Sequence, residues 1–206
     1  MTTAPMTVAA LILAAGKSSR MEGANKLLAP LGGGPMIARV AAAALASRAR
    51  PVVVVTGHEA DKVAAALAGL AVEIVRNPDY ARGLSASLKV GIGALRETGV
   101  AGALVLLGDM PRVTAATLDR LIAAFAQSGG KAICVPEAEG RRGNPVLWPA
   151  DLFAAMAGLA GDKGARDLFA RHPDRTLPVA AAAGEILADV DTPEDLARAR
   201  VDISPV

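Results

Sequence analysis

The sequence has a single cysteine, few aromatic residues and no strong excess of charge of one sign. Cys134 has no second cysteine with which to form an internal disulfide, which fits a reducing compartment. Aromatic residues make up 2% of the chain, too few for the stacked rings that bind single-stranded nucleic acid. The 22 Lys and Arg residues are scattered and nearly balanced by 20 Asp and Glu, which disfavours nucleic acid as a partner but allows a small anionic ligand.

Long apolar runs are also missing, since none reaches the roughly 18 residues that a membrane helix needs. The apolar run Val8–Ala15 has no basic residue before it and leads directly into Gly16-Lys17-Ser18. We therefore interpret it as a strand and not as the core of a signal peptide, and we expect a cytoplasmic protein without a membrane partner. The length of 206 residues predicts one domain with a sizeable core, and the 52% hydrophobic fraction argues against disorder.

Short apolar runs alternate with helical patterns along most of the chain. Unbroken apolar runs are typical of strands covered on both faces, and they occur at Val8–Leu13, Val52–Val55, Val72–Val75, Ala103–Leu107 and Ala132–Val135. Helices are predicted between them at Met36–Arg48, Glu59–Leu70, Ser85–Leu95 and Ala115–Gln127. This alternation predicts an α/β fold of three layers, with right-handed crossovers joining the strands of a mostly parallel central sheet.

The pattern changes after Cys134. A turn-rich basic loop, Gly140–Pro145, precedes a short strand, and a second glycine-containing loop follows at Gly161–Gly164. Neither loop resembles a linker, so we interpret the second half as part of the same domain. The elements predicted here are a strand at Val146–Trp148, a helix at Ala150–Ala157, strands near Arg175–Val179 and Ile186–Val190, and a helix opened by Thr192-Pro193-Glu194.

Three segments whose residues could bind a ligand or a metal follow predicted strands: Ala14–Arg20, Gly108–Pro111 and Asp189–Pro193. Because ligands of open α/β sheets bind beyond the carboxyl ends of the strands, we expect the three segments to face one crevice. The small residues of the first loop let backbone N–H groups approach a phosphate, whose charge Arg20 and Lys26 would neutralise. Carboxylates in the other two segments suit Mg²⁺ that bridges them to substrate phosphates.

The first loop matches neither of the two best-known phosphate loops. A Walker A loop needs glycine at the position of Leu11, and a dinucleotide fingerprint needs three glycines where this loop has Gly16 alone. A P-loop kinase and a nicotinamide dehydrogenase are therefore disfavoured.

The order Leu-Ala-Ala-Gly-x-Ser-x-Arg-Met from Leu13 to Met21, followed by Lys26, resembles the signature of the MobA-like nucleotidyltransferases. This resemblance implies a Rossmann-like nucleotide-diphospho-sugar transferase fold. Further similar segments are spread over nearly the whole chain: Val55–His58, Asn77–Tyr80, Gly83–Leu88, Gly108–Pro111, Arg142–Val146, Gly161–Arg166 and Asp189–Glu194.

Within that superfamily the sequence is most similar to the molybdenum cofactor cytidylyltransferases, which transfer CMP from CTP onto molybdopterin. Ala14-Ala15-Gly16 stands where the guanylyl enzymes typically carry a double glycine, and Ser85–Leu88 resembles the cytidylyl form of the ribose and base loop. The resemblance implies a Mg²⁺-dependent enzyme, with CTP and molybdopterin as substrates and a recipient molybdoenzyme or its chaperone as a further partner. The alternatives are a GTP-dependent guanylyltransferase, a sugar-phosphate nucleotidyltransferase, and a non-catalytic accessory protein that binds nucleotide or cofactor.

The resemblance also assigns roles to the matched residues. Arg20 would hold the pyrophosphate leaving group, Lys26 would bind the α-phosphate, and Asp109 and Asp191 would hold Mg²⁺. The family often has Asn at the second metal position, and Asp189 is a less favoured substitute for Asp191. Nucleotide-binding roles are implied for Leu13, Ala14, Ala15, Gly16, Asn77, Gly83, Ser85 and Ser87, and acceptor-side roles for Arg142, Gly143, Asn144 and the Gly161–Arg166 loop.

On this interpretation residues 1–135 form the nucleotide-binding half, and residues 136–206 form the acceptor-side half with the C-terminal metal segment. Asp191 also suits the N-cap of the helix at Pro193. A phosphate monoester loses its second proton near pH 6, so the acceptor arrives as a nucleophile and needs no general base. Cys134 is expected in the core, and His58, His172 and Trp148 are expected to be structural or surface residues.

Overall fold

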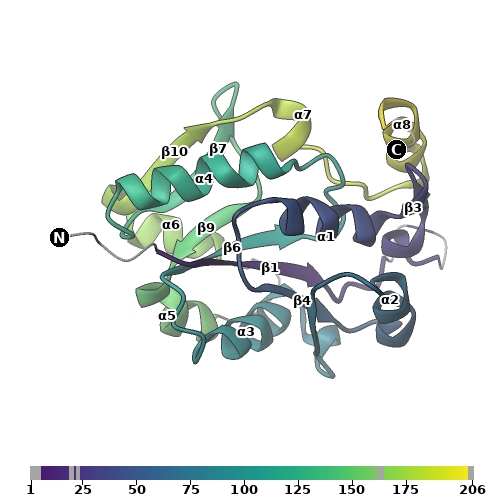
Figure 1. Cartoon of the computed structure of the whole chain (residues 1–206), viewed down its shortest axis with the longest axis horizontal. Coiled ribbons are helices and arrows are strands. Elements are labelled where there is room, and N and C mark those ends of the chain that lie inside the picture. The colour runs from purple at the N-terminus through teal and green to yellow at the C-terminus, as the bar shows by residue number, and fades with distance from the viewer. Residues whose placement is uncertain (1–5, 19–20, 22–23, 160, 162–164, 204–206) are drawn as a thin grey trace.

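The main sheet runs through the centre of the molecule, as the computed structural model shows for residues 6–18, 21, 24–159, 161 and 165–203 (Figure 1). Within this part of the chain it has eight strands in the order β10-β7-β9-β6-β1-β4-β5, with β8 paired to β7. The pairs β1–β4, β1–β6, β4–β5 and β7–β10 are parallel, whereas β9 is antiparallel to both of its neighbours. The strands are β1 (Val8–Ala14), β4 (Val52–Thr56), β5 (Glu73–Arg76), β6 (Gly102–Leu107), β7 (Ile133–Ala138), β8 (Arg141–Arg142), β9 (Val146–Pro149) and β10 (Thr176–Ala180).

Helices cover both faces of this sheet, so the predicted three-layer α/β fold with a mostly parallel sheet is confirmed. In Figure 1, α1 (Met36–Ala46) and α4 (Ala115–Gln127) lie above the strands, while α3 (Leu84–Leu95) and α5 (Phe153–Ala157) lie below. Side chains of β1 alternate between the two cores: Ala10 and Ile12 pack with the α1 and α4 layer, and Leu11 and Leu13 with the α3 layer. Because both faces are covered, every residue of β1 is buried.

A third apolar cluster seats the C-terminal helix α8 (Pro193–Asp202) beside the hairpin of β2 (Pro30–Leu31) and β3 (Gly34–Pro35). The arrow of β1 in Figure 1 points toward the side of the molecule where α8, β3 and α2 (Ala60–Ala66) lie. The carboxyl ends of the parallel strands therefore open toward these elements. The remaining short elements are η1 (Lys26–Leu28), η2 (Tyr80–Arg82), η3 (Ala150–Leu152), α6 (Arg166–Arg171), η4 (Pro173–Arg175) and α7 (Ala183–Ile186).

Several sequence predictions differ from the structure. The strand expected near Ile186–Val190 is absent, because α7 ends at Ile186 and the chain continues to α8 without forming a strand. The strand expected at Val72–Val75 begins at Glu73, and it is mostly exposed because it is an edge strand with β4 as its neighbour. The predicted helices Met36–Arg48 and Glu59–Leu70 are shorter in the structure, and the predicted helix at Ala150–Ala157 divides into η3 and α5.

None of the helices in the described ranges combines the length and the apolar character needed to cross a membrane.

Candidate active site

A cavity of about 350 Å³ lies at the carboxyl ends of β1 and β6. It brings together segments that are far apart in the sequence: the loop after β1, η1, the start of α3, the turn after β6 and the segment before α8. Its lining residues are Leu13, Ala14, Ala15, Gly16, Ser18, Lys26, Leu27, Tyr80, Gly83, Leu84, Ser87, Leu107, Gly108, Asp109 and Asp191.

One ammonium group joins two carboxylates in this cavity. The Nζ atom of Lys26 lies 2.6 Å from Oδ2 of Asp109 and 2.6 Å from Oδ1 of Asp191. Burial acts to lower the pKa of Lys26, but the two carboxylates outweigh it, and the pKa is raised above its ordinary value. Lys26 is therefore a fixed positive charge at neutral pH, and the predicted convergence of Lys26, Asp109 and Asp191 is found in the structure.

The first carboxylate is positioned by the sheet. Asp109 stands two residues after the end of β6, and the Gly108 N–H donates to the carbonyl oxygen of Leu13 at the end of β1, over 3.0 Å. A Cβ atom on Gly108 would lie only 3.2 Å from that same oxygen, so glycine permits the close approach. Two adjacent parallel strands thus fix where Asp109 emerges.

The second carboxylate is positioned differently, because no strand precedes it. The Val190 N–H donates to the carbonyl oxygen of Asp109 over 2.9 Å, which ties the two acidic segments together. The N-cap of α8 is Thr192, not Asp191, and its capping box is closed by the side chain of Asp195. Oδ2 of Asp195 also accepts from the backbone N–H of Asp191 over 3.1 Å. The expected capping role of Asp191 is therefore wrong, and its side chain faces the cavity.

The short helix η1 positions Lys26. The Asn25 side chain caps this helix by accepting from the Leu27 N–H over 3.1 Å. The Lys26 N–H donates to Oγ of Ser18 over 3.2 Å, which folds the loop after β1 back onto η1. Ser18 also lines the cavity, a role that the sequence interpretation did not assign to it.

The loop after β1 leaves space beside these charges. Gly16 is exposed, lines the cavity, and has no positive φ angle that would require glycine. A Cβ atom built on Gly16 would meet no atom of the described residues within 4 Å. Packing within this part of the chain therefore gives no reason for glycine here, whereas a ligand close to the backbone does.

The two carboxylates fit a divalent cation. Oδ1 of Asp109 is buried and has no hydrogen-bond partner among the described residues, which is unusual for a buried carboxylate oxygen. Carboxylate oxygens are the ligands that Mg²⁺ and Mn²⁺ prefer. The described residues contain no group of three or more His, Cys, Asp and Glu side chains that could hold a metal. A cation held by Asp109 and Asp191 would take its other ligands from substrate phosphates and water.

The residues predicted near base and ribose form a second wall. Gly83 and Ser87 line the cavity, whereas Asn77 and Ser85 are buried and do not. Asn77 instead supports the wall from behind, because its Nδ2 donates to Oγ of Ser87 over 3.0 Å. Tyr80 lines the same wall and was missed by the sequence interpretation, although it ends the quoted segment Asn77–Tyr80.

The predicted acceptor-side residues are divided between two places. The carbonyl oxygen of Gly161 accepts from the Ser85 N–H at the start of α3 over 3.2 Å, whereas none of Arg142, Gly143 and Asn144 lines the cavity. Arg142 is exposed, with its guanidinium 5.7 Å from the ring centre of Phe169. A Cβ atom on Gly143 would lie 2.2 Å from the carbonyl oxygen of Ile186, so glycine here serves the packing against α7.

Two further predictions cannot be placed. Arg20 lies outside the described residues, as do residues 162–164 of the predicted acceptor loop. Cys134 is fully buried in β7, as predicted, and burial raises the pKa of its thiol to about 11. Trp148 is buried as well, which agrees with a structural role.

The family model described as the MobA-like NTP transferase domain matches residues 10–176 of the chain. The chain is 34% identical over 190 residues to the bifunctional protein GlmU of Leifsonia xyli, covering 89% of this chain and 36% of that protein. GlmU of Kineococcus radiotolerans is 40% identical over 138 residues, which are 66% of this chain and 28% of that protein. The chain thus spans about a third of the length of these curated relatives.

Solved structures of other proteins share the fold. A nucleotidyl transferase from Methanothermobacter thermautotrophicus superposes with a TM-score of 0.82 at 29% identity, covering 96% of this chain and 97% of that one. Rv0371c from Mycobacterium tuberculosis, solved in complex with manganese, superposes with a TM-score of 0.74 at 28% identity, covering 96% and 100% of the two chains.

Proposed function

Because this chain belongs to the family of MobA-like NTP transferase domains, we propose that it moves CMP from CTP onto the terminal phosphate of molybdopterin and releases pyrophosphate. The observation that carries the transferase part of this proposal is the joint contact of Lys26 with Asp109 and Asp191 in the cavity. A cation, two carboxylates and an open glycine loop together match the needs of a transferring phosphoryl group.

Some residues of the chain would bind the nucleotide, and others would neutralise the negative charge of its phosphates. The backbone from Leu13 to Gly16 would lie against the nucleotide, and Lys26 would bind the α-phosphate. Asp109 and Asp191 would hold Mg²⁺, which, when bound, neutralises negative charge on the transferring phosphoryl group. Arg20 would hold the pyrophosphate that leaves, while the acceptor phosphate attacks in line without a general base.

The choice of CTP depends on smaller features of the same cavity. Ala15 stands where guanylyl enzymes typically carry a second glycine, and it is buried in the cavity wall. Ser87, from the segment that resembles the cytidylyl loop, lines the wall beside Gly83. These residues support a cytidine nucleotide, and the likeness to molybdenum cofactor cytidylyltransferases supports molybdopterin as the acceptor.

The test is an assay of pyrophosphate release with Mg²⁺, molybdopterin and CTP, GTP, ATP or UTP in turn. We expect release with CTP that requires both the metal and the acceptor. A preference for GTP would contradict the base assignment, and release with a sugar phosphate but not with molybdopterin would contradict the acceptor assignment. Nucleotide binding without release under any combination would instead support an accessory protein. Replacing Mg²⁺ by Mn²⁺ in the same assay identifies the effective metal.

A further inference from the structure

Tyr80 is the only tyrosine of the chain and the only aromatic residue among the described residues that line the cavity. It opens η2, in the segment that joins β5 to α3, and its side chain is half-buried. The other lining residues are aliphatic, small, polar or charged. Among the described residues the cavity therefore has one flat aromatic surface, and no residue role in the proposed function uses it.

The absence of a side chain at Gly57 makes room for Tyr80. A Cβ atom on Gly57 would lie 2.5 Å from Cβ of Tyr80 and 2.8 Å from Cβ of Ala15, distances that real Cβ atoms essentially never show. The missing side chain at Gly57 thus allows Tyr80 to pack close to Ala15 at the end of β1. Gly57 belongs to the Val55–His58 segment, which the proposed function leaves without a role.

Asn77 fixes the backbone that carries Tyr80. The Asn77 N–H donates to the carbonyl oxygen of Thr56 over 2.8 Å, and its side-chain oxygen accepts from the Asp79 N–H over 3.0 Å. Because Asn77 also bonds Ser87, η2 and α3 are held as one wall. The backbone that carries Tyr80 is therefore held in position without a ligand. A ligand that packs on a surface held in this way loses less affinity to the ordering of the protein.

The ring lies next to the predicted phosphate loop. Nζ of Lys17, in the loop after β1, is 5.9 Å from the centre of the Tyr80 ring. In the sheet, β6 with Asp109 lies on one side of β1, whereas β4 and β5, which lead to Gly57 and Tyr80, lie on the other. A triphosphate at Lys26 and Asp109 would therefore face Tyr80 across the cavity, on the wall that Gly83 and Ser87 also line.

We propose that Tyr80 is a base-contacting residue whose ring, positioned by the absence of a side chain at Gly57, packs against the planar base of the nucleotide. This inference rests on the proposed function, since it needs a nucleoside triphosphate in the cavity. An aromatic ring recognises a base through its flat face, whereas it gives nothing to the phosphates. The contribution of Tyr80 should therefore appear with CTP and be absent with inorganic triphosphate.

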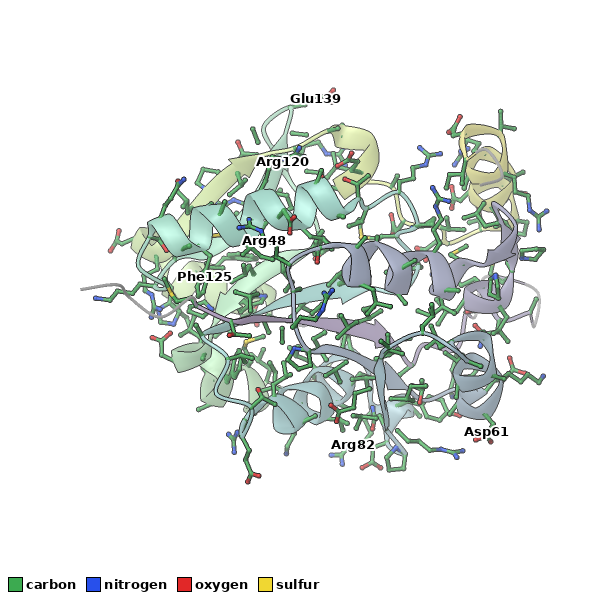
Figure 2. All side chains as sticks on the ribbon, in the orientation of Figure 1. Arg48, Asp61, Arg82, Arg120, Phe125 and Glu139 are labelled. Atoms are coloured by element: carbon green, nitrogen blue, oxygen red, sulfur yellow. The ribbon has the colours of Figure 1, made fainter. Side chains whose placement is uncertain are left out.

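The experiment measures dissociation constants for Mg²⁺-CTP and for Mg²⁺-triphosphate by calorimetry, on the whole chain. The variants are Tyr80→Phe, which keeps the ring, Tyr80→Leu, which keeps apolar volume without the ring, and Tyr80→Ala. Arg82→Ala is the matched control from the same short helix η2, since Arg82 is exposed and points away from the molecule in Figure 2. Circular dichroism establishes that each variant is folded.

We expect Tyr80→Ala and Tyr80→Leu to weaken CTP binding at least about fivefold while triphosphate binding stays within about twofold. Tyr80→Phe should bind CTP nearly as the wild type does, and Arg82→Ala should change neither constant. Gly57→Ala adds a methyl group that would clash with Tyr80 and displace it. This variant should also weaken CTP binding more than triphosphate binding.

Unchanged CTP affinity in both Tyr80→Leu and Tyr80→Ala would overturn the inference, as would an equal loss for CTP and triphosphate. Failure of the proposed function has a different signature, because it is visible in the wild type. A wild-type protein that binds triphosphate but no nucleoside triphosphate would overturn both proposals. A wild-type protein that prefers GTP, with that preference lost in Tyr80→Ala, would overturn the choice of CTP and support the role of Tyr80.

Discussion

The two acidic segments of the site reach the same lysine by different structural means. Asp109 follows the central strand β6, and the adjacent strand β1 holds the neighbouring Gly108 through a backbone hydrogen bond. Asp191 follows a segment that belongs to no strand, and its position depends on the Val190 to Asp109 bond and on the capping box of α8. Their exposure differs accordingly: 20% of the Asp109 side chain is accessible, against 32% for Asp191.

This difference indicates that the sheet fixes one half of the carboxylate pair and that α8 carries the other half. The seat of α8 is the small apolar cluster formed with Met36, Leu31 and Met21. The position of Asp191 therefore depends on the stability of that cluster and of the α8 cap, whereas the position of Asp109 depends on the core of the sheet.

The largest expected effect comes from neutralising each carboxylate in turn. We expect Asp109→Asn to lower pyrophosphate release at least about 100-fold, because it removes the less exposed of the two negative charges beside Lys26. Asp191→Asn should lower release on the order of tenfold, the kinetic equivalent of about 1.4 kcal/mol, since the more exposed segment can adjust and an amide oxygen remains. The measurement is steady-state pyrophosphate release at saturating Mg²⁺.

The control for both variants is Asp189→Asn, an exposed carboxylate two residues before Asp191. Its release rate should stay near that of the wild type. Equal losses for Asp109→Asn and Asp191→Asn would show that the two segments do not differ in the way the structure indicates. Near-normal release by Asp109→Asn would refute the assignment of Asp109.

A smaller effect is expected when the cap of α8 is removed. Asp195→Ala deletes the acceptor for the backbone N–H groups of Asp191 and Thr192, so Asp191 should be held less firmly. We expect the free energy of unfolding to fall by about 1 kcal/mol and the Mg²⁺ concentration for half-maximal activity to rise.

Glu194→Ala is the matched control for the cap, because Glu194 lies in the same turn, is exposed and takes no part in the capping box. It should leave the Mg²⁺ requirement unchanged. If Asp195→Ala lowered stability with no change in that requirement, the cap would be structural and would not position Asp191.

The smallest effect at neutral pH concerns the sheet itself, because it emerges only at alkaline pH, where it is measured through Cys134 in β7. Burial raises the pKa of this thiol from its ordinary 9.0 to about 11, so the unfolded chain loses the proton first as the pH rises. The free energy of unfolding should therefore decline between about pH 9 and pH 11, and Cys134→Ala should lack this part of the decline. In the folded protein at pH 8.5, iodoacetamide should leave Cys134 unmodified, and rapid alkylation there would contradict a closed sheet.

Much of the first half of the chain could be predicted from the sequence because its signals are local. Buried strands such as β1 and β4 appear as unbroken apolar runs, and α4 has the bounds that its periodicity predicts. Asp109 follows such a run closely, so the strand-end rule predicts its place near the loop after β1. Lys26 stands farther along the chain from β1, and the rule does not predict its contact with Asp109.

The C-terminal part was harder to predict because its decisive contacts are distant in sequence. The apolar pattern near Ile186–Val190 suggested a strand, yet the Ile186 carbonyl accepts from the Asn144 N–H in another loop. Tyr80 was missed for a similar reason, since its role depends on a missing Cβ at Gly57. Sequence spacing does not report either contact.

The sequence by itself determined the three-layer α/β class, the glycine-containing loop and the identity of the charged residues. Hydrophobic periodicity and residue type are local properties, so they can be read without knowing the tertiary structure. Only the tertiary structure decided that Lys26 lies between Asp109 and Asp191, that Thr192 caps α8 in place of Asp191, and that Tyr80 lines the cavity. Each of these depends on backbone bonds and close packing between segments that the chain separates and the fold brings together.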